Sequence, residues 1–143
     1  MTMYQYPDYL YNFGVKGMKW GVRKRNKIKE KASAKLGAQN RRAHTRTLMA
    51  RNALYSNDSD IIKNSVHPKD AKNITSAKKA LKEDIKYYSA INRNTFAKLL
   101  KLNQLSIDNM STKMYKQKVN EILNDTKDYS VSEIVALQNA RLK

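Results

Sequence analysis

The chain has 143 residues and carries 29 Lys and Arg against 12 Asp and Glu, which gives a formal net charge of +17. Only 41% of its residues are hydrophobic, a low share for one independent core, so we expect burial against other copies or a larger assembly. The absence of cysteine excludes disulfides and thiolate metal sites.

The positive charge is far from neutrality and predicts attraction to a polyanion such as DNA, RNA, an acidic protein face or anionic lipid. The alternative is that the charges only keep solvent-facing helices soluble. No apolar run is long enough for a bilayer span, so we expect no membrane span. The start of the chain lacks the pattern of a signal peptide, and we expect use without secretion.

Residues 1–13 are rich in aromatic side chains, many of them at alternate positions. This spacing suits an extended segment with one aromatic face, and Pro7 disfavours a helix. Such a segment either inserts into a groove on a partner or folds back onto the helices of its own chain.

Residues 14–24 contain three of the four glycines and the only tryptophan. Glycine allows tight turns and close approach to another surface, while the other positions supply apolar contacts and positive charge. We therefore predict an extended, Gly-rich docking arm over residues 1–23, which continues into the basic helix. The proposed docking motif comprises Gly14, Val15, Lys16, Gly17, Met18, Lys19, Trp20, Gly21, Val22, Arg23 and Lys24.

These eleven residues resemble a short motif of virion and head-morphogenesis proteins of tailed bacteriophages. The motif recurs there in otherwise dissimilar proteins: capsid-associated, portal-linked and cargo-like. Many of those proteins place histidine just before the first glycine, whereas this chain has Asn12 and Phe13. The resemblance implies a virion component of the phage head, made in the bacterial host cytoplasm, but no chemistry for the motif.

Residues 24–55 predict a long basic helix with a thin apolar seam, either continuous or broken near Gly37 and Asn40. Between Arg23 and Arg51 there is a single acid, Glu30. Basic side chains bind phosphate oxygens with affinity but little sequence specificity. The candidate polyanion-binding residues are Arg25, Lys27, Lys29, Lys31, Lys35, Arg41, Arg42, Arg46 and Arg51.

Residues 56–69 are rich in Ser, Asn and Asp and are predicted to be a linker, followed by a helical bundle over residues 70–143. The bundle begins with the strongest periodic segment, a helix expected from about Asp70 to Leu105. Its seam should pack, in a coiled-coil-like hairpin or bundle, against a helix of the same chain or of another copy. The candidate self-association residues are Ile74, Leu81, Ile85, Tyr88, Ile91, Leu99 and Leu102.

Two shorter helices are expected after this one. Ser111 is a candidate N-cap for a helix from Thr112 to about Asn124. Ser130 and Glu133 have the spacing of a capping box before a last helix.

No pattern of catalytic or metal-binding residues is present. His44 and His67 lack metal-ligand spacing, the linker composition accounts for Asp58 and Asp60, and no glycine-rich phosphate loop precedes a Lys-Ser or Lys-Thr pair. We expect no enzymatic activity, no cofactor and no metal. Trp20 is interpreted as an anchor for a protein pocket, with stacking on bases as the alternative.

Together these features predict a mostly α-helical phage virion structural protein, head-associated or internal. We expect docking to capsid, portal or neighbouring subunits, non-specific contact with packaged DNA, and a homo-oligomer. One alternative is a scaffold or assembly factor that mature particles lack. Another is a non-structural phage protein that binds nucleic acid or inhibits a host defence.

Overall fold

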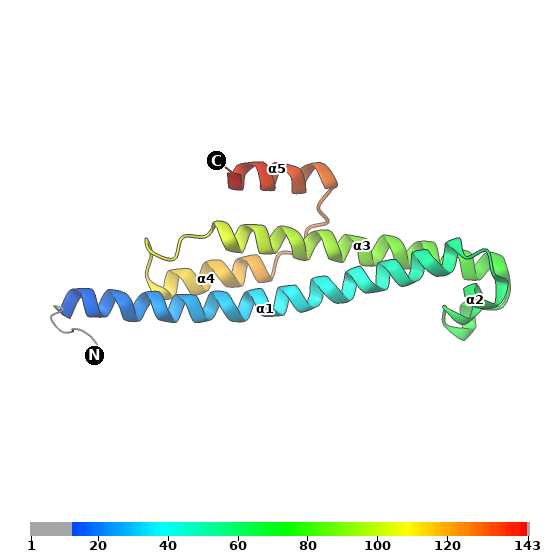
Figure 1. The fold of residues 1–143 in the computed structure, drawn as a ribbon, viewed down its shortest axis with the longest axis horizontal. Coiled ribbons are helices and arrows are strands. Elements are labelled where there is room, and N and C mark those ends of the chain that lie inside the picture. The colour runs from blue at the N-terminus through cyan, green and yellow to red at the C-terminus, as the bar shows by residue number, and fades with distance from the viewer. Residues whose placement is uncertain (1–12, 143) are drawn as a thin grey trace.

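The computed structural model describes the backbone of residues 13–142 and the side chains of residues 20–140. Figure 1 shows two long helices side by side, with shorter helices packed on them and no strand in the described range. This confirms the mostly α-helical class. The elements are α1 (Phe13–Tyr55), α2 (Ser59–Asn64), the short 3-10 helix η1 (Pro68–Asp70), α3 (Ile74–Gln104), α4 (Thr112–Leu123) and α5 (Val131–Leu142).

The predicted arm is helical over residues 13–23, because α1 begins at Phe13. The expectation of an extended segment there is wrong: no glycine in the described part of the chain has a positive φ. Glycine permits a turn but does not require one, and α1 runs unbroken through the glycines of this segment. Residues 1–12, with Tyr4, Tyr6, Tyr9 and Tyr11, lie outside the described residues.

The long helix α1 is continuous, so a break near Gly37 and Asn40 does not occur. Asn40 instead joins α1 to α3. Its Nδ2 donates to the carbonyl of Asn92 at 3.0 Å and to Oγ1 of Thr95 at 2.9 Å, while Nδ2 of Asn92 donates to the carbonyl of Asn40 at 3.3 Å. These paired amides fix the register of α1 against α3. Thr95 interrupts the apolar seam of α3 because its hydroxyl accepts a hydrogen bond from Asn40.

The predicted linker contains a helix, α2, whose formation the composition of residues 56–69 did not indicate. Asp58 caps it, because its Oδ1 accepts from the backbone N–H of Asp60 at 3.0 Å and of Ile61 at 3.3 Å. Ile62 is 1% exposed and packs in one cluster with Ala77 and Leu81 of α3. The burial of Ile62 therefore stabilises a short helix within a segment of mostly polar composition.

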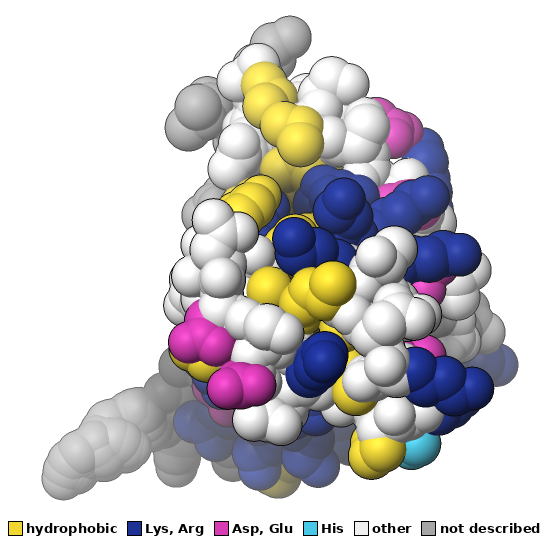
Figure 2. Space-filling view, turned by 90° about the vertical axis from the view of Figure 1, so that its right-hand side faces the viewer, with side chains coloured by type: hydrophobic (Ala, Val, Ile, Leu, Met, Phe, Trp, Pro, Cys, Tyr) yellow, Lys and Arg dark blue, Asp and Glu magenta, His cyan; other side chains and the backbone are white. Residues whose placement is uncertain are grey.

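Figure 2 looks onto the end of the molecule that α2 forms, where hydrophobic side chains lie among Lys and Arg side chains. Tyr55, at the end of α1, is 74% exposed, and Ile61 of α2 is 46% exposed.

Within the described residues, the core consists of three small clusters. The first joins α1, α3 and α4 through Ala32, Leu36, Leu102, Tyr115 and Val119. The second joins α1, α2 and α3 through Ala50, Ala53, Ile62, Ala77 and Leu81, and the third joins α3 to Tyr129 and α5 through Ala97, Leu100, Tyr129 and Ile134. Alanine supplies much of the α1 side, so the two long helices approach closely.

The candidate self-association seam is engaged within one chain. Leu81 and Leu102 are buried, Ile74 and Ile85 pack on the second cluster, and Leu99 packs on the first. The partner helix that the periodicity required is thus α1 of the same chain. Self-association remains a prediction, but these side chains already have their apolar partners.

Both predicted caps of the last two helices are confirmed. Oγ of Ser111 accepts from the N–H of Met114 at 3.1 Å. Oγ of Ser130 accepts from the N–H of Glu133 at 3.2 Å, and Oε1 of Glu133 accepts from the N–H of Ser130 at 3.0 Å. Hydrogen bonds from the Lys127 ammonium and then from the Ser130 backbone lower the pKa of Glu133 to about 2.

Tyr115 is fully buried, and its hydroxyl has no hydrogen-bond partner among the described residues. An unpaired buried hydroxyl costs about 1–3 kcal/mol, so we expect Tyr115→Phe to leave the free energy of unfolding unchanged or raise it by about 1 kcal/mol. Urea unfolding measures this. The matched control is Tyr129→Phe, which should be destabilising because the Tyr129 hydroxyl donates to Asp125 and accepts from Lys101. A clear loss of stability for Tyr115→Phe would contradict the unpaired hydroxyl.

Candidate functional site

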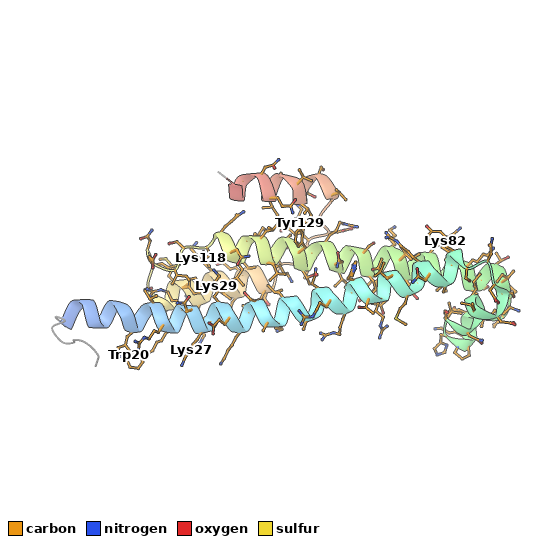
Figure 3. All side chains as sticks on the ribbon, viewed as in Figure 1. Trp20, Lys27, Lys29, Lys82, Lys118 and Tyr129 are labelled. Carbon is orange, nitrogen blue, oxygen red and sulfur yellow. The ribbon has the colours of Figure 1, made fainter. Side chains whose placement is uncertain are left out.

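The docking motif forms the first turns of α1, at the end of the molecule away from α2. There α1 extends past the connection between α3 and α4 (Figure 1). Trp20 is 60% exposed, and Arg23 and Lys24 are also exposed. Figure 3 shows Trp20 and Lys27 projecting from the same side of α1, away from α3 and α4. Side chains of residues 14–19 lie outside the described ones, so Gly14, Val15, Lys16, Gly17, Met18 and Lys19 are placed only as helical backbone.

The motif is tied to the bundle by Arg25, which is only 7% exposed. Its Nε donates to the carbonyl of Ile107, and its Nη1 donates to Oγ1 of Thr112 at 3.3 Å. Ile107 lies in the connection between α3 and α4, and Thr112 begins α4. Arg25 therefore holds α1 against this connection, and the prediction that it binds a polyanion is not supported by its position.

Gly21 lies one helical turn before Arg25 and makes room for this contact. A Cβ at position 21 would come within 2.9 Å of Nη1 of Arg25. The glycine therefore leaves room for the guanidinium where it lies, and a larger residue at position 21 would make the end of the Arg25 side chain shift. The sequence contains a signal for the buried position of Arg25. Its spacing continues the apolar seam of Ile28, Ala32 and Leu36 toward the N-terminus.

The other candidate polyanion-binding residues lie along α1. Lys27, Lys31 and Lys35 are exposed on its first half, and Lys29 is half-buried. The candidates exposed on its second half are Arg41, Arg42, Arg46 and Arg51. Glu30 is the one carboxylate among the residues of this helix that the structure describes. The helix thus presents positive charge over most of its length.

The structure gathers two of these arginines with a third cation that sequence analysis missed. Arg42 and Arg46 border a cavity of about 380 Å³ between α1 and α3, and Lys98 of α3 lines the same cavity. Tyr88 and Ile91, which were assigned to the self-association seam, line it as well. Lys98 gave no local signal in the sequence, because only the packing of α3 on α1 places it there.

Neither histidine has a ligand-like environment. His44 is exposed, and Nδ1 of His67 accepts from the N–H of Lys69 at 3.3 Å as the cap of η1. Among the residues described, no group of three His, Asp or Glu side chains lies close enough to hold a metal ion. In the same part of the chain, none of the helices combines the length and apolar character needed to cross a membrane.

Comparison with known proteins gives one similarity. Residues 3–27 match the model of a family of unknown function, DUF7211. The matched range contains the whole docking motif and ends just after Arg25. No curated protein and no solved structure matches the chain.

Proposed function

We propose that the chain is a structural component of a tailed-phage virion that docks through the first turns of α1 onto capsid, portal or a neighbouring subunit. The observation that carries this proposal is the exposed Trp20 on a helix that extends past the bundle. Tryptophan dominates the energy of many protein interfaces, because a large rigid apolar surface is buried with little loss of conformational entropy. The resemblance of residues 14–24 to head proteins supplies the class of partner.

The helical state of the motif supports a particular mode of docking. A helix face that presents side chains at spacings of three, four and seven residues suits a groove on a partner protein. Trp20, Lys24 and Lys27 have this spacing, and all three are exposed. The aromatic anchor would enter the groove, while the lysines would contact an acidic rim. Basic side chains farther along α1 would face packaged DNA without reading its sequence.

Mass spectrometry of mature particles, both full and emptied of DNA, tests the class of protein. We expect the chain in both samples if protein contacts hold it. Presence only in full heads would identify cargo that leaves with the genome. Absence from both would overturn the virion proposal in favour of a scaffold or a non-structural nucleic-acid-binding or defence-inhibiting protein.

The docking surface is tested by Trp20→Ala, with Tyr87→Ala as a matched control. Tyr87 is 62% exposed on α3, so both variants remove an exposed aromatic side chain and leave the core unchanged. We expect Trp20→Ala to lower incorporation into particles at least about tenfold, because an interface anchor contributes about 2 kcal/mol or more. Tyr87→Ala should be incorporated normally. Normal incorporation of a Trp20→Ala variant with unchanged circular dichroism would refute the docking surface.

A further inference from the structure

We propose that the cavity between α1 and α3 is a phosphate-binding site, which takes a phosphate group of a nucleic-acid backbone or of a free nucleotide. The proposal deepens the DNA-facing part of the proposed function, because it names the residues of α1 and α3 that would contact a phosphate group. Its nucleic-acid form rests on that part of the proposed function, and both forms are independent of docking through Trp20.

The cavity has the charge of an anion site. Arg42 and Arg46 come from one face of α1, since they are one helical turn apart, and Lys98 comes from α3. Among the side chains that the structure describes, no carboxylate lines the cavity. Its volume of about 380 Å³ falls within the roughly 300–1,000 Å³ range of ligand sites.

Arg46 is held in place before any ligand arrives. Its Nη1 donates to the hydroxyl of Tyr88 at 3.1 Å, and its guanidinium carbon lies 5.5 Å from the centre of the Tyr88 ring. A guanidinium carries five N–H donors, so this contact leaves several for a phosphate. Preorganisation of this kind reduces the entropy lost when a ligand binds.

Lys98 is a nearly buried cation, with 8% of its surface exposed. Its Nζ donates to the carbonyl of Leu123 at 2.9 Å, which uses one of the three ammonium hydrogens. The carboxylate whose charge acts on Lys98, that of Asp125, pairs with Lys101 at 3.4 Å and with the hydroxyl of Tyr129. Burial lowers the pKa of Lys98, the charge of Asp125 opposes this, and Lys35 adds to it. A bound phosphate would supply this ammonium with a direct counter-charge.

Asn94 shapes the cavity without serving as a donor in it. Its Nδ2 donates to the carbonyls of Asp125 at 3.1 Å and of Lys127 at 2.8 Å, so both amide hydrogens are used. These bonds hold the connection between α4 and α5 against α3. The charged donors left for a phosphate are therefore Arg42, Arg46 and Lys98, and the amide of Gln39 also lines the cavity.

The test compares two double variants of the full chain with equal loss of charge. Arg42→Gln with Arg46→Gln changes the cavity, while Arg41→Gln with Arg51→Gln removes two exposed arginines of the same helix outside the lining. Lys98 is left in place because it also holds the Leu123 carbonyl. Circular dichroism checks that both variants remain folded. The probes are inorganic phosphate, ADP and a single-stranded oligonucleotide. Their binding is measured by NMR of the arginine Nε–H groups and by fluorescence anisotropy.

We expect the cavity variant to weaken oligonucleotide binding about tenfold and to reduce the slope of log affinity against log salt by about 1–2. The control variant should lose about threefold or less, and phosphate should shift the Nε–H signals of Arg42 and Arg46 in the unmodified chain. Binding of ADP but not of the oligonucleotide would support the cavity and overturn contact with packaged DNA. Equal weakening by both variants would overturn the cavity and leave a diffuse DNA contact intact. If none of the probes binds, both the phosphate site in the cavity and the contact with DNA are overturned.

Discussion

Leu102→Ala is expected to lower the free energy of unfolding by about 3–5 kcal/mol. Leu102 is fully buried where α3 meets both α1 and α4, in one cluster with Leu36, Tyr115 and Val119. Removal of its side chain loses apolar burial and leaves a cavity among three helices, which a closely packed interior fills only partly by relaxing. Because the core consists of small clusters, this single change should remove a large part of the total stability.

Urea unfolding followed by circular dichroism measures the effect. Leu48→Ala is the matched control, since Leu48 is 42% exposed on α1 and should cost about 0.5 kcal/mol or less. A loss below about 1.5 kcal/mol for Leu102→Ala would mean that α4 can collapse onto the vacated space.

The second large effect is expected for Arg25→Ala. We expect a loss of about 2–3 kcal/mol, because hydrogen bonds from a charged group contribute about 1.5–3 kcal/mol and the Ile107 carbonyl loses its partner. The change should be local first: the early turns of α1 separate from the connection between α3 and α4. Relative to the unmodified chain, amide hydrogen exchange should then accelerate more in the first turns of α1 than in the middle of α3.

Two further variants separate this contact from a general effect of charge. Arg23→Ala removes an exposed arginine two residues away and should leave both unfolding and exchange unchanged. Gly21→Val should reproduce part of the Arg25→Ala exchange pattern, because a Cβ at position 21 approaches Nη1 of Arg25 to 2.9 Å. If exchange in the first turns of α1 is unchanged by Arg25→Ala, Arg25 does not hold this segment.

Signals that extend over one helical turn were read correctly from the sequence. Ser111 and the Ser130–Glu133 pair cap the helices that they were expected to cap, since a cap depends on groups two or three residues away. The seam of α3 was recognised for the same reason, because Leu81 and Leu102 recur with the helical period. The short helix α2 was missed, as its formation depends on Ile62 packing against Ala77 and Leu81, which are distant in sequence.

Composition and local pattern by themselves determined that this chain is helical, strongly basic and marked by one distinctive segment around Trp20. The tertiary structure decided which basic side chains are used within the fold and which remain free to contact a ligand. Arg25 serves the fold because its acceptor, the Ile107 carbonyl, lies 82 residues away, and Lys98 joins Arg42 and Arg46 only when α3 packs on α1. A side chain's charge is a property of its type, whereas its partner depends on which distant backbone and side-chain groups folding brings within reach.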